Sequence, residues 1–243
     1  MNLLSRVGDS NFSRDLDKLG AANWQNRKAN VKKKIKDMAE KLIRVAAQRE
    51  MVTTEKLSVP ENYSEFSKKF PFQLTDDQET AINEIILDLE AGKLMDRLIC
   101  GDVGFGKTEV ALRAIVRAVS SLKQVVMLCP TTVLSDQHYI TTKERLAPLG
   151  ISIALLSRFQ TKKDQLLVLR GLLSGSVDLV VGTHRLLSDD VVVPSLGLLI
   201  VDEEHRFGVK NKEAIRALKT KVDVLSMSAT PIPRTLQQSL LGI

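Results

Sequence analysis

The eight residues from Gly101 to Thr108 have the types and the spacing needed to bind a triphosphate. Their sequence, GDVGFGKT, fits G-x-x-x-x-G-K-[ST] at every fixed position. The glycines let successive backbone N–H groups turn inward, and the helix expected to follow adds its partial positive charge. Lys107 can reach the β- and γ-phosphates, and the Thr108 hydroxyl can bind Mg²⁺. We therefore expect a nucleoside triphosphate site here rather than a chance glycine-rich turn.

Three consecutive carboxylates, Asp202, Glu203 and Glu204, follow an apolar run about 95 residues after Lys107. Adjacent like charges repel one another, so they are expected where a cation gathers them or where each has a separate function. Asp202 ends the run, the usual position of the carboxylate that holds Mg²⁺ opposite a phosphate loop. Glu203 is then well placed to orient and deprotonate an attacking water. An acidic loop at a strand end is the alternative, which the upstream phosphate loop disfavours.

The elements that would position these groups alternate along the chain after Pro71. Strand-like runs occur at DRLICG, QVVMLCP, ISIALLS, VDLVVGT, LGLLIVDE and VDVLSMSAT, and helical segments separate most of them. The runs are almost continuously apolar, which is typical of a parallel sheet covered by helices on both faces. We predict one doubly wound α/β lobe over residues 71–243. Its first helix should begin after the N-cap Thr75 and end near Gly92.

A basic helical arm is predicted before the lobe. Apolar residues recur at spacings of three and four between Trp24 and Met51, which indicates a long amphipathic helix. Residues 24–56 hold ten Lys and Arg against four Asp and Glu, which accounts for the net charge of +6. A basic excess is compatible with nucleic acid or an acidic partner, and equally with a solvated helix face.

Composition excludes several classes of protein. Aliphatic residues must form most of the core, because the hydrophobic share is 44% and the aromatic share only 4%. No apolar run is long enough to cross a bilayer, and the N-terminus lacks the pattern of a signal peptide. Cys100 and Cys129 both lie in strand-like runs, so we expect two buried thiols and a cytoplasmic location.

Several short motifs in order resemble those of superfamily 2 helicases and translocases. The segment DEEH resembles the DExH form of motif II, and FPFQLTDDQ resembles the adenine-reading Q motif, with Phe72 and Gln78. PTTVLSDQH is similar to motif Ia, VGTHRLL to motif Ib, and SATP to motif III. Thr131, Thr132 or His184 taken alone would more often be a helix cap or a turn residue. Together the motifs imply a RecA-like, ATP-binding lobe.

Longer phrases resemble the bacterial transcription-repair coupling factors, the Mfd translocases. They are MDRLICGDVGFGKTEVALRA, GLLIVDEEHRFGV and SATPIPRTLQ. RecG-type branch-migration helicases share HRFGV and TPIPRT but usually have Gln in place of Glu204. The resemblance also implies that residues 1–20 end an RNA-polymerase-interacting module. Residues 21–70 would then be a basic connector helix with its linker, and residues 71–243 the first helicase lobe.

The resemblance implies a double-stranded DNA translocase that uses ATP and Mg²⁺, displaces stalled RNA polymerase and recruits excision-repair proteins. Catalysis would involve Lys107, Asp202 and Glu203, with Thr108 and Asp202 at Mg²⁺. The implied ATP contacts are Phe72, Gln78, Gly101, Asp102, Val103, Gly104, Phe105, Gly106, Lys107, Thr108 and Glu109. The implied coupling residues are His205, Ser228 and Thr230. The implied DNA contacts, directed at the backbone, are Thr131, Thr132, Gln137, Thr183, His184, Arg185 and Arg234.

Two further expectations concern what the chain does by itself. The motifs end with SATP, so we expect a fragment without the second RecA-like lobe, which binds ATP–Mg²⁺ weakly and hydrolyses it poorly. A second hypothesis is a non-catalytic module that docks DNA or protein and uses the nucleotide as a switch. The intact Lys107, Asp202 and Glu203 argue against a dead site.

Overall fold

The computed structural model describes residues 63–229 continuously, together with shorter stretches before them. Those stretches are 29–33, 35–36, 39–40, 43, 47, 49, 51–57 and 59–61. The chain divides into two compact units, Met1–Arg44 with Thr235–Ile243 and Val45–Arg234. The described residues of the first unit are helical, as predicted for the arm. The predictions for residues 1–28 lie outside the described residues.

Helices and parallel strands alternate through the second unit, as the sequence predicted. The helices are α2 (Tyr63–Lys68), α3 (Asp76–Glu90), α4 (Lys107–Ser120), α5 (Thr132–Leu146), α6 (Lys162–Ser174) and α7 (Val209–Lys219). The strands are β1 (Asp96–Cys100), β2 (Gln124–Leu128), β3 (Ile153–Leu156), β4 (Leu179–Gly182), β5 (Leu196–Asp202) and β6 (Asp223–Ser228). Short 3₁₀ turns are η1 (Ala147–Leu149), η2 (His184–Leu187) and η3 (Glu204–Arg206).

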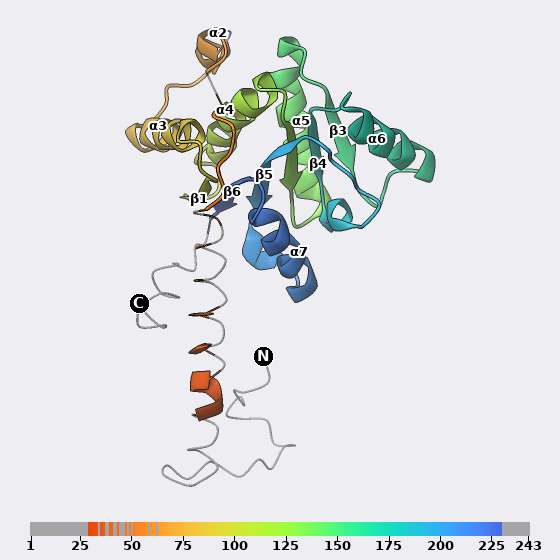
Figure 1. The fold of residues 1–243 in the computed structure, drawn as a ribbon. Helices are drawn as coiled ribbons and strands as arrows, with labels where there is room; N and C mark the ends of the chain where they lie inside the picture. The colour runs from red at the N-terminus through yellow and green to blue at the C-terminus, as the bar shows by residue number, and fades with distance from the viewer. Residues whose placement is uncertain are drawn as a thin grey trace, which may run out of the picture. The chain divides into compact units, whose positions relative to one another are not determined.

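The strands form one sheet in the order β1-β6-β5-β2-β4-β3, and every neighbouring pair is parallel. Because parallel neighbours need crossover connections, each return passes over a face of the sheet through a helix or a loop (Figure 1). The order is not the chain order, since β5 and β6 lie between β1 and β2. The predicted α/β fold class is confirmed.

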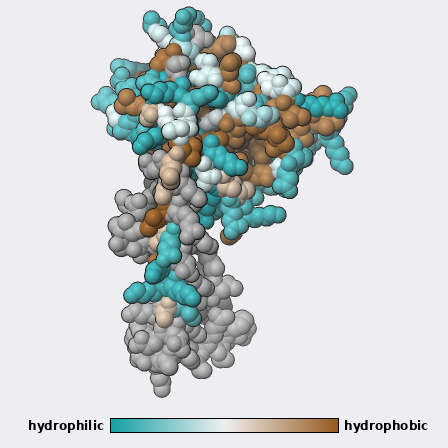
Figure 2. All heavy atoms as spheres, in the orientation of Figure 1, coloured by the Kyte–Doolittle hydropathy of each residue, from teal (hydrophilic) through white to brown (hydrophobic). Residues whose placement is uncertain are grey.

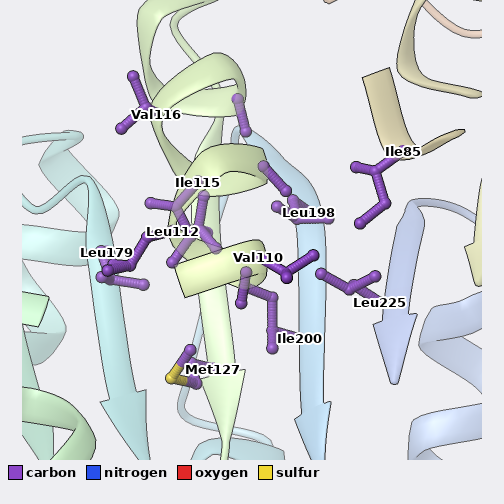
Figure 3. Close-up of a cluster of buried hydrophobic side chains, with 14 of the residues drawn as sticks. Ile85, Val110, Leu112, Ile115, Val116, Met127, Leu179, Leu198, Ile200 and Leu225 are labelled. Atoms are coloured by element: carbon purple, nitrogen blue, oxygen red, sulfur yellow. The ribbon is translucent and has the colours of Figure 1, made fainter. Parts of the chain in front are cut away.

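Alternate residues of the strands face two separate hydrophobic layers. Leu198 and Ile200 of β5 pack with α3, α4 and α5, whereas Leu199 and Val201 pack with α6 and α7. Figure 3 shows Leu112 and other side chains of α4 lying against the strands of the first layer. The core is mostly aliphatic, as the composition required. Figure 2 shows brown side chains gathered over the part of the lobe that carries β3, β4 and α6.

Helix α3 begins where the sequence predicted. Thr75 is the N-cap, and its hydroxyl accepts a hydrogen bond from the backbone N–H of Gln78. The Gln78 side chain accepts in return from the Thr75 backbone N–H, which completes a capping box. Gly92, just after the C-cap, has φ +71°, a conformation that favours glycine. The capping box at Thr75, at the start of α3, fixes Gln78 close to the phosphate loop.

The two cysteines differ in exposure. Cys129 is fully buried, and burial with the nearby Asp202 charge raises the pKa of its thiol. Cys100 is exposed, so the prediction of two buried thiols was wrong for it. It is the last residue of β1, which is the outer strand of the sheet as described. Among the described residues, no helix combines the length and apolarity needed to cross a membrane.

Asp223 is a buried carboxyl group at the start of β6. It accepts a hydrogen bond of 2.7 Å from the backbone N–H of Met95 and is only 5% exposed. Burial raises its pKa from 3.8 to about 6, although the Met95 bond and the nearby Arg49 charge lower it. The native state therefore binds a proton more tightly than the unfolded chain does.

We expect this group to destabilise the fold as the pH rises from about 4 to about 6. The stabilising effect of its protonation is complete below pH 3.8 and is lost as the pH passes 6. With about 1.4 kcal/mol per pKa unit, the loss is up to about 3 kcal/mol. Urea unfolding of wild type and Asp223→Asn at several pH values measures it. If the difference between the two unfolding free energies does not change with pH, the assignment is wrong.

Candidate nucleotide-binding site

Three of the predicted motifs meet at the carboxyl ends of neighbouring strands. In the register of the sheet, Cys100 of β1 pairs with Ser228 of β6, and Asp202 of β5 pairs with Met227 of β6. The backbone N–H of Gly101 donates to the carbonyl of Ser228 at 3.2 Å. The N–H of Glu203 donates to the carbonyl of Met227 at 2.8 Å. The phosphate loop, the acids and motif III therefore share one edge.

The phosphate loop is a turn in which two of the three glycines adopt left-handed backbone angles. Gly104 has φ +85° and Gly106 φ +69°, and α4 begins immediately afterwards at Lys107. The Lys107 ammonium donates to the carbonyls of Gly101 at 2.6 Å and Asp102 at 2.9 Å. The ammonium therefore lies over the loop, where a bound phosphate would compete with the two carbonyls for its hydrogen bonds. The strand–turn–helix context predicted from the sequence is present.

Gln78 joins the predicted Q motif to this loop. Its amide donates to the carbonyl of Phe105 at 2.9 Å. A Cβ built on Gly106 would lie 2.5 Å from the same amide nitrogen, closer than real atoms approach. The backbone angle favours glycine at position 106, and a side chain there would also displace the end of the Gln78 side chain.

Gly106→Ala is expected to weaken ATP binding at least about 10-fold and to lower the free energy of unfolding by about 1–3 kcal/mol. The substitution strains the backbone and displaces Gln78 from the loop. Gly150→Ala is the matched control, because Gly150 has φ +78° but nothing within 4 Å of its Cβ position. Calorimetric titration with MgATP and urea unfolding measure both quantities. An equal loss of ATP affinity in both variants would contradict the contact with Gln78.

The three consecutive carboxylates have separate partners, which explains how like charges persist together. Asp202 is 7% exposed and binds the Nε2 atom of His138 at 3.0 Å. Glu204 accepts from the ammonium of Lys219 at 2.7 Å. His138 and Lys219 were not among the predicted site residues. His138 directly follows the predicted Gln137, and its place in motif Ia was the only sequence signal for it.

Glu203 is held by the residues of motif III. Its carboxylate accepts from the hydroxyl of Ser228 at 3.0 Å and from the backbone N–H of Ala229 at 2.6 Å. The Nδ1 atom of His205 lies 3.2 Å from the same carboxylate. Glu203 also has φ +47°, a left-handed angle that is uncommon for a residue with a side chain. Ser228 and His205, two of the predicted coupling residues, thus both contact the predicted base.

Most of the predicted DNA contacts lie on two adjacent strand ends. Leu128 of β2 pairs with Gly182 of β4, so the segments that follow them begin side by side. Thr131 is exposed and caps α5 by accepting from the Leu134 N–H. Thr132 and Gln137 also lie on α5, with Gln137 exposed.

The second strand end carries the other described DNA candidates. His184 is exposed, whereas Thr183 is buried and its hydroxyl has no hydrogen-bond partner in the structure. Arg185 donates twice to Asp190, at 2.7 and 2.6 Å, and once to Gln165. Thr230 and Arg234 lie outside the described residues.

The predicted ATP contacts differ in how they face the loop. Val103 and Phe105 expose their side chains, and Phe72 is 73% exposed. Glu109 is instead 4% exposed, and its carboxylate binds Arg113 and Arg145. A contact of Glu109 with ATP would therefore have to come from its backbone.

The oxygen ligands of the site fit Mg²⁺ bound together with phosphates. No group of three or more His, Cys, Asp or Glu within the described part of the chain could hold a metal by itself. Mg²⁺ usually keeps several waters and takes one or two protein carboxylates in addition to substrate phosphates. Asp202 uses only Oδ2 for His138, and Thr108 lies in the first turn of α4.

The sequence of the chain is similar to those of known proteins. The family model described as DEAD/DEAH box helicase matches residues 75–239. The transcription-repair-coupling factor of Bacillus subtilis (strain 168) is 50% identical over 238 residues, covering 98% of this chain and 20% of that protein. That of Haemophilus influenzae is 49% identical over 245 residues, covering 100% and 21%. The chain spans about a fifth of the length of these curated relatives.

Solved structures share the fold. A structure of RecG bound to a three-way DNA junction matches with a TM-score of 0.70 and 38% identity, covering 82% of this chain and 27% of that one. The crystal structure of the DUF1998 helicase MrfA matches with a TM-score of 0.56 and 16% identity, over 76% and 32%. The second likeness supports the fold alone.

Proposed function

The chain belongs to the DEAD/DEAH box helicase family, and from this premise we propose that it is the ATP-binding lobe of a double-stranded DNA translocase. We further propose that the translocase acts as a transcription-repair coupling factor, displacing stalled RNA polymerase and linking it to excision repair. The observation that carries the proposal is the meeting of the phosphate loop, the acids and motif III at one sheet edge.

The proposed ATP chemistry assigns a separate task to each group. The loop N–H groups and Lys107 bind the phosphates, and Lys107 exchanges its two carbonyl partners for phosphate oxygens. Thr108 and Asp202 hold Mg²⁺, which supplies charge stabilisation for phosphoryl transfer when bound. Glu203 orients the attacking water and accepts its proton.

Glu203 is proposed to link hydrolysis to the grip on DNA. Ser228 and Ala229 each donate to one oxygen of its carboxylate, so an attacking water has to share this carboxylate with motif III. We propose that Glu203 acts after motif III shifts. His205 contacts the same carboxylate, so it would transmit the shift of motif III to the rest of the site.

DNA is proposed to lie across the ends of β2 and β4, where Thr131, Thr132, Gln137, His184 and Arg185 are found. Arg234, the remaining predicted DNA contact, lies outside the described residues. Contacts of this kind reach the phosphate backbone and do not read sequence. They suit a motor that must work on any gene.

Arg185 and Asp190 give a direct test of this surface. Replacement of Arg185 by Gln is expected to weaken duplex binding about 3–10-fold and to reduce the salt slope by about one. Asp190→Asn is expected to strengthen binding about 2–5-fold, because it removes the carboxylate that now competes with DNA for Arg185. Fluorescence anisotropy of a labelled duplex at several salt concentrations measures both.

Arg216→Gln is the control, since Arg216 is an exposed arginine on α7. Its affinity for the duplex should stay close to that of the wild type. If Arg216→Gln and Arg185→Gln weaken duplex binding equally, the DNA is attracted by the overall positive charge and not by the proposed surface. Weaker binding after Asp190→Asn would mean that the ion pair supports the surface instead of competing with DNA.

A RecG-type branch-migration helicase is the second candidate, favoured by the 38% identity with RecG on its three-way junction. The two candidates differ in the DNA that they prefer. In a competition experiment, a coupling factor should bind linear duplex as well as a three-way junction. A preference of 10-fold or more for the junction would favour the RecG-type function.

A further inference from the structure

A buried ionic cluster lies directly behind the phosphate loop. Glu109, two residues after Lys107, is 4% exposed. Arg113 donates to its Oε1 at 2.8 Å, and Arg145 donates to both carboxylate oxygens at 3.1 Å. The two arginines come from different helices, α4 and α5. One carboxylate therefore gathers a buried guanidinium group, that of Arg113, and a partly buried one, that of Arg145, beside the residues that are proposed to bind phosphate.

The same arginines hold the segment that precedes α3. Arg145 donates to the carbonyl of Lys69 at 2.9 Å. Its guanidinium carbon lies 4.9 Å from the ring centre of Phe66 and 5.6 Å from that of Phe70. Arg113 lies 5.3 Å from the Phe66 ring and donates to the hydroxyl of Ser67. The contacts of Arg145, unlike those of Arg113, reach the Phe70 end of this segment.

The short stretch between Phe70 and Thr75 is thereby fixed at both ends. Arg145 holds its start through Lys69 and Phe70, and the capping box with Gln78 holds its end. Gln78 in turn contacts the phosphate loop. Phe72 lies between these fixed points, packs edge-to-face on Phe70 with ring centres 5.6 Å apart, and is 73% exposed.

An exposed aromatic ring in a segment that is connected to the phosphate loop through Gln78 has a specific use. A ring can stack on a flat base, and such stacking is favourable for any base because each has a π-face. A flexible ring would lose part of this gain to ordering upon binding. A pre-positioned ring adds affinity for the base without affecting the phosphates.

We propose that Arg145 is a positioning residue that places the Phe70–Phe72 segment against the nucleotide base. Glu109 lies in α4 and orients Arg145. The helix that begins with the phosphate-binding Lys107 therefore also determines where the base is contacted. This inference rests on the proposed ATP binding and adds the part of the chain that supports the base. Arg145 itself touches neither the base nor the phosphates.

The test compares a ligand that has a base with one that has none. Wild type, Arg145→Met and Arg145→Lys are titrated calorimetrically with MgATP and with magnesium tripolyphosphate. We expect Arg145→Met to weaken ATP binding about 10-fold and to leave tripolyphosphate binding within about 2-fold of wild type. Arg145→Lys should stay close to Arg145→Met, because lysine keeps the charge but lacks the planar fork.

Phe72→Ala is the second variant, because an exposed ring can be removed without affecting the core. It should show the same selective loss for ATP, even if Arg145→Met does not fold. An Arg145→Met protein that folds and binds ATP like wild type overturns the inference. So does an equal loss for both ligands in Arg145→Met or in Phe72→Ala, because that pattern indicates a general disturbance of the loop.

Failure of the proposed function has a different signature. If the wild type binds neither MgATP nor magnesium tripolyphosphate, the phosphate loop does not bind triphosphates, and the inference is overturned with the proposed function. If the wild type binds both equally tightly and Phe72→Ala changes nothing, the loop works and only the base contact is absent. Each result therefore identifies which of the two statements is wrong.

Discussion

Lys107→Ala is expected to weaken MgATP binding about 100–1000-fold, which corresponds to about 3–4 kcal/mol. The ammonium of Lys107 lies across the loop on the carbonyls of Gly101 and Asp102, so it is already where a triphosphate would be bound. Removal of one member of a charge-assisted contact leaves the phosphate oxygens without their cation inside a partly enclosed site. Titration with a labelled ATP analogue measures the change.

Lys123→Ala is the matched control for this experiment. Lys123 is also a partly exposed lysine, but it pairs with Glu55 and directly precedes β2, at the amino ends of the strands. Its loss should leave ATP affinity within about 2-fold, because surface pairs contribute little and the site lies at the other edge of the sheet. Unchanged affinity in Lys107→Ala would refute the phosphate-loop assignment and would leave the docking-module hypothesis without its nucleotide switch.

Ile200→Ala is expected to lower the free energy of unfolding by about 4 kcal/mol. Ile200 lies in β5, is fully buried, and belongs to the hydrophobic layer between the sheet and α4 (Figure 3). Three carbons removed from this layer leave a cavity that the parallel strands on both sides cannot close without breaking their register. Urea unfolding followed by circular dichroism gives the difference.

The control for Ile200 is the same substitution at an exposed position. Ile140 on α5 is 55% exposed, so Ile140→Ala should change the free energy of unfolding by less than about 0.5 kcal/mol. Alanine is also the better helix former, which favours a small gain. Comparable losses in the two variants would mean that β5 is not the centre of the core.

The local features of the site were predictable because short patterns specify them. The GDVGFGKT pattern requires a strand before it and a helix after it, and β1 and α4 stand at those places. Thr75 was predicted to cap a helix and does so, since a hydroxyl at that position pairs with the first free N–H groups. The family resemblance inferred from the motifs is confirmed by the match over residues 75–239.

Other features depend on residues that are far apart in the sequence. The family resemblance implied that Glu109 contacts ATP, but its side chain is bound to Arg145, 36 residues later. Its pairing with Arg113, four residues later on the same helix, is a local pattern, but no pattern near Glu109 indicates Arg145, which the packing of α5 against α4 brings to it. Cys100 was predicted to be buried because the run that contains it is apolar. Its exposure follows from the position of β1 at the outside of the sheet.

By itself, the sequence determined the phosphate loop, the acids at the end of a buried strand, the parallel α/β class and the family. The loop, the acids and the fold class follow from residue types and hydrophobic spacing within short segments, and the family follows from the resemblance of short motifs. Only the tertiary structure decided which partner each carboxylate has, including the contact of His138 with Asp202 across 64 residues. Such pairs depend on the strand order β1-β6-β5-β2-β4-β3, which is set by how the whole core packs and not by any one segment.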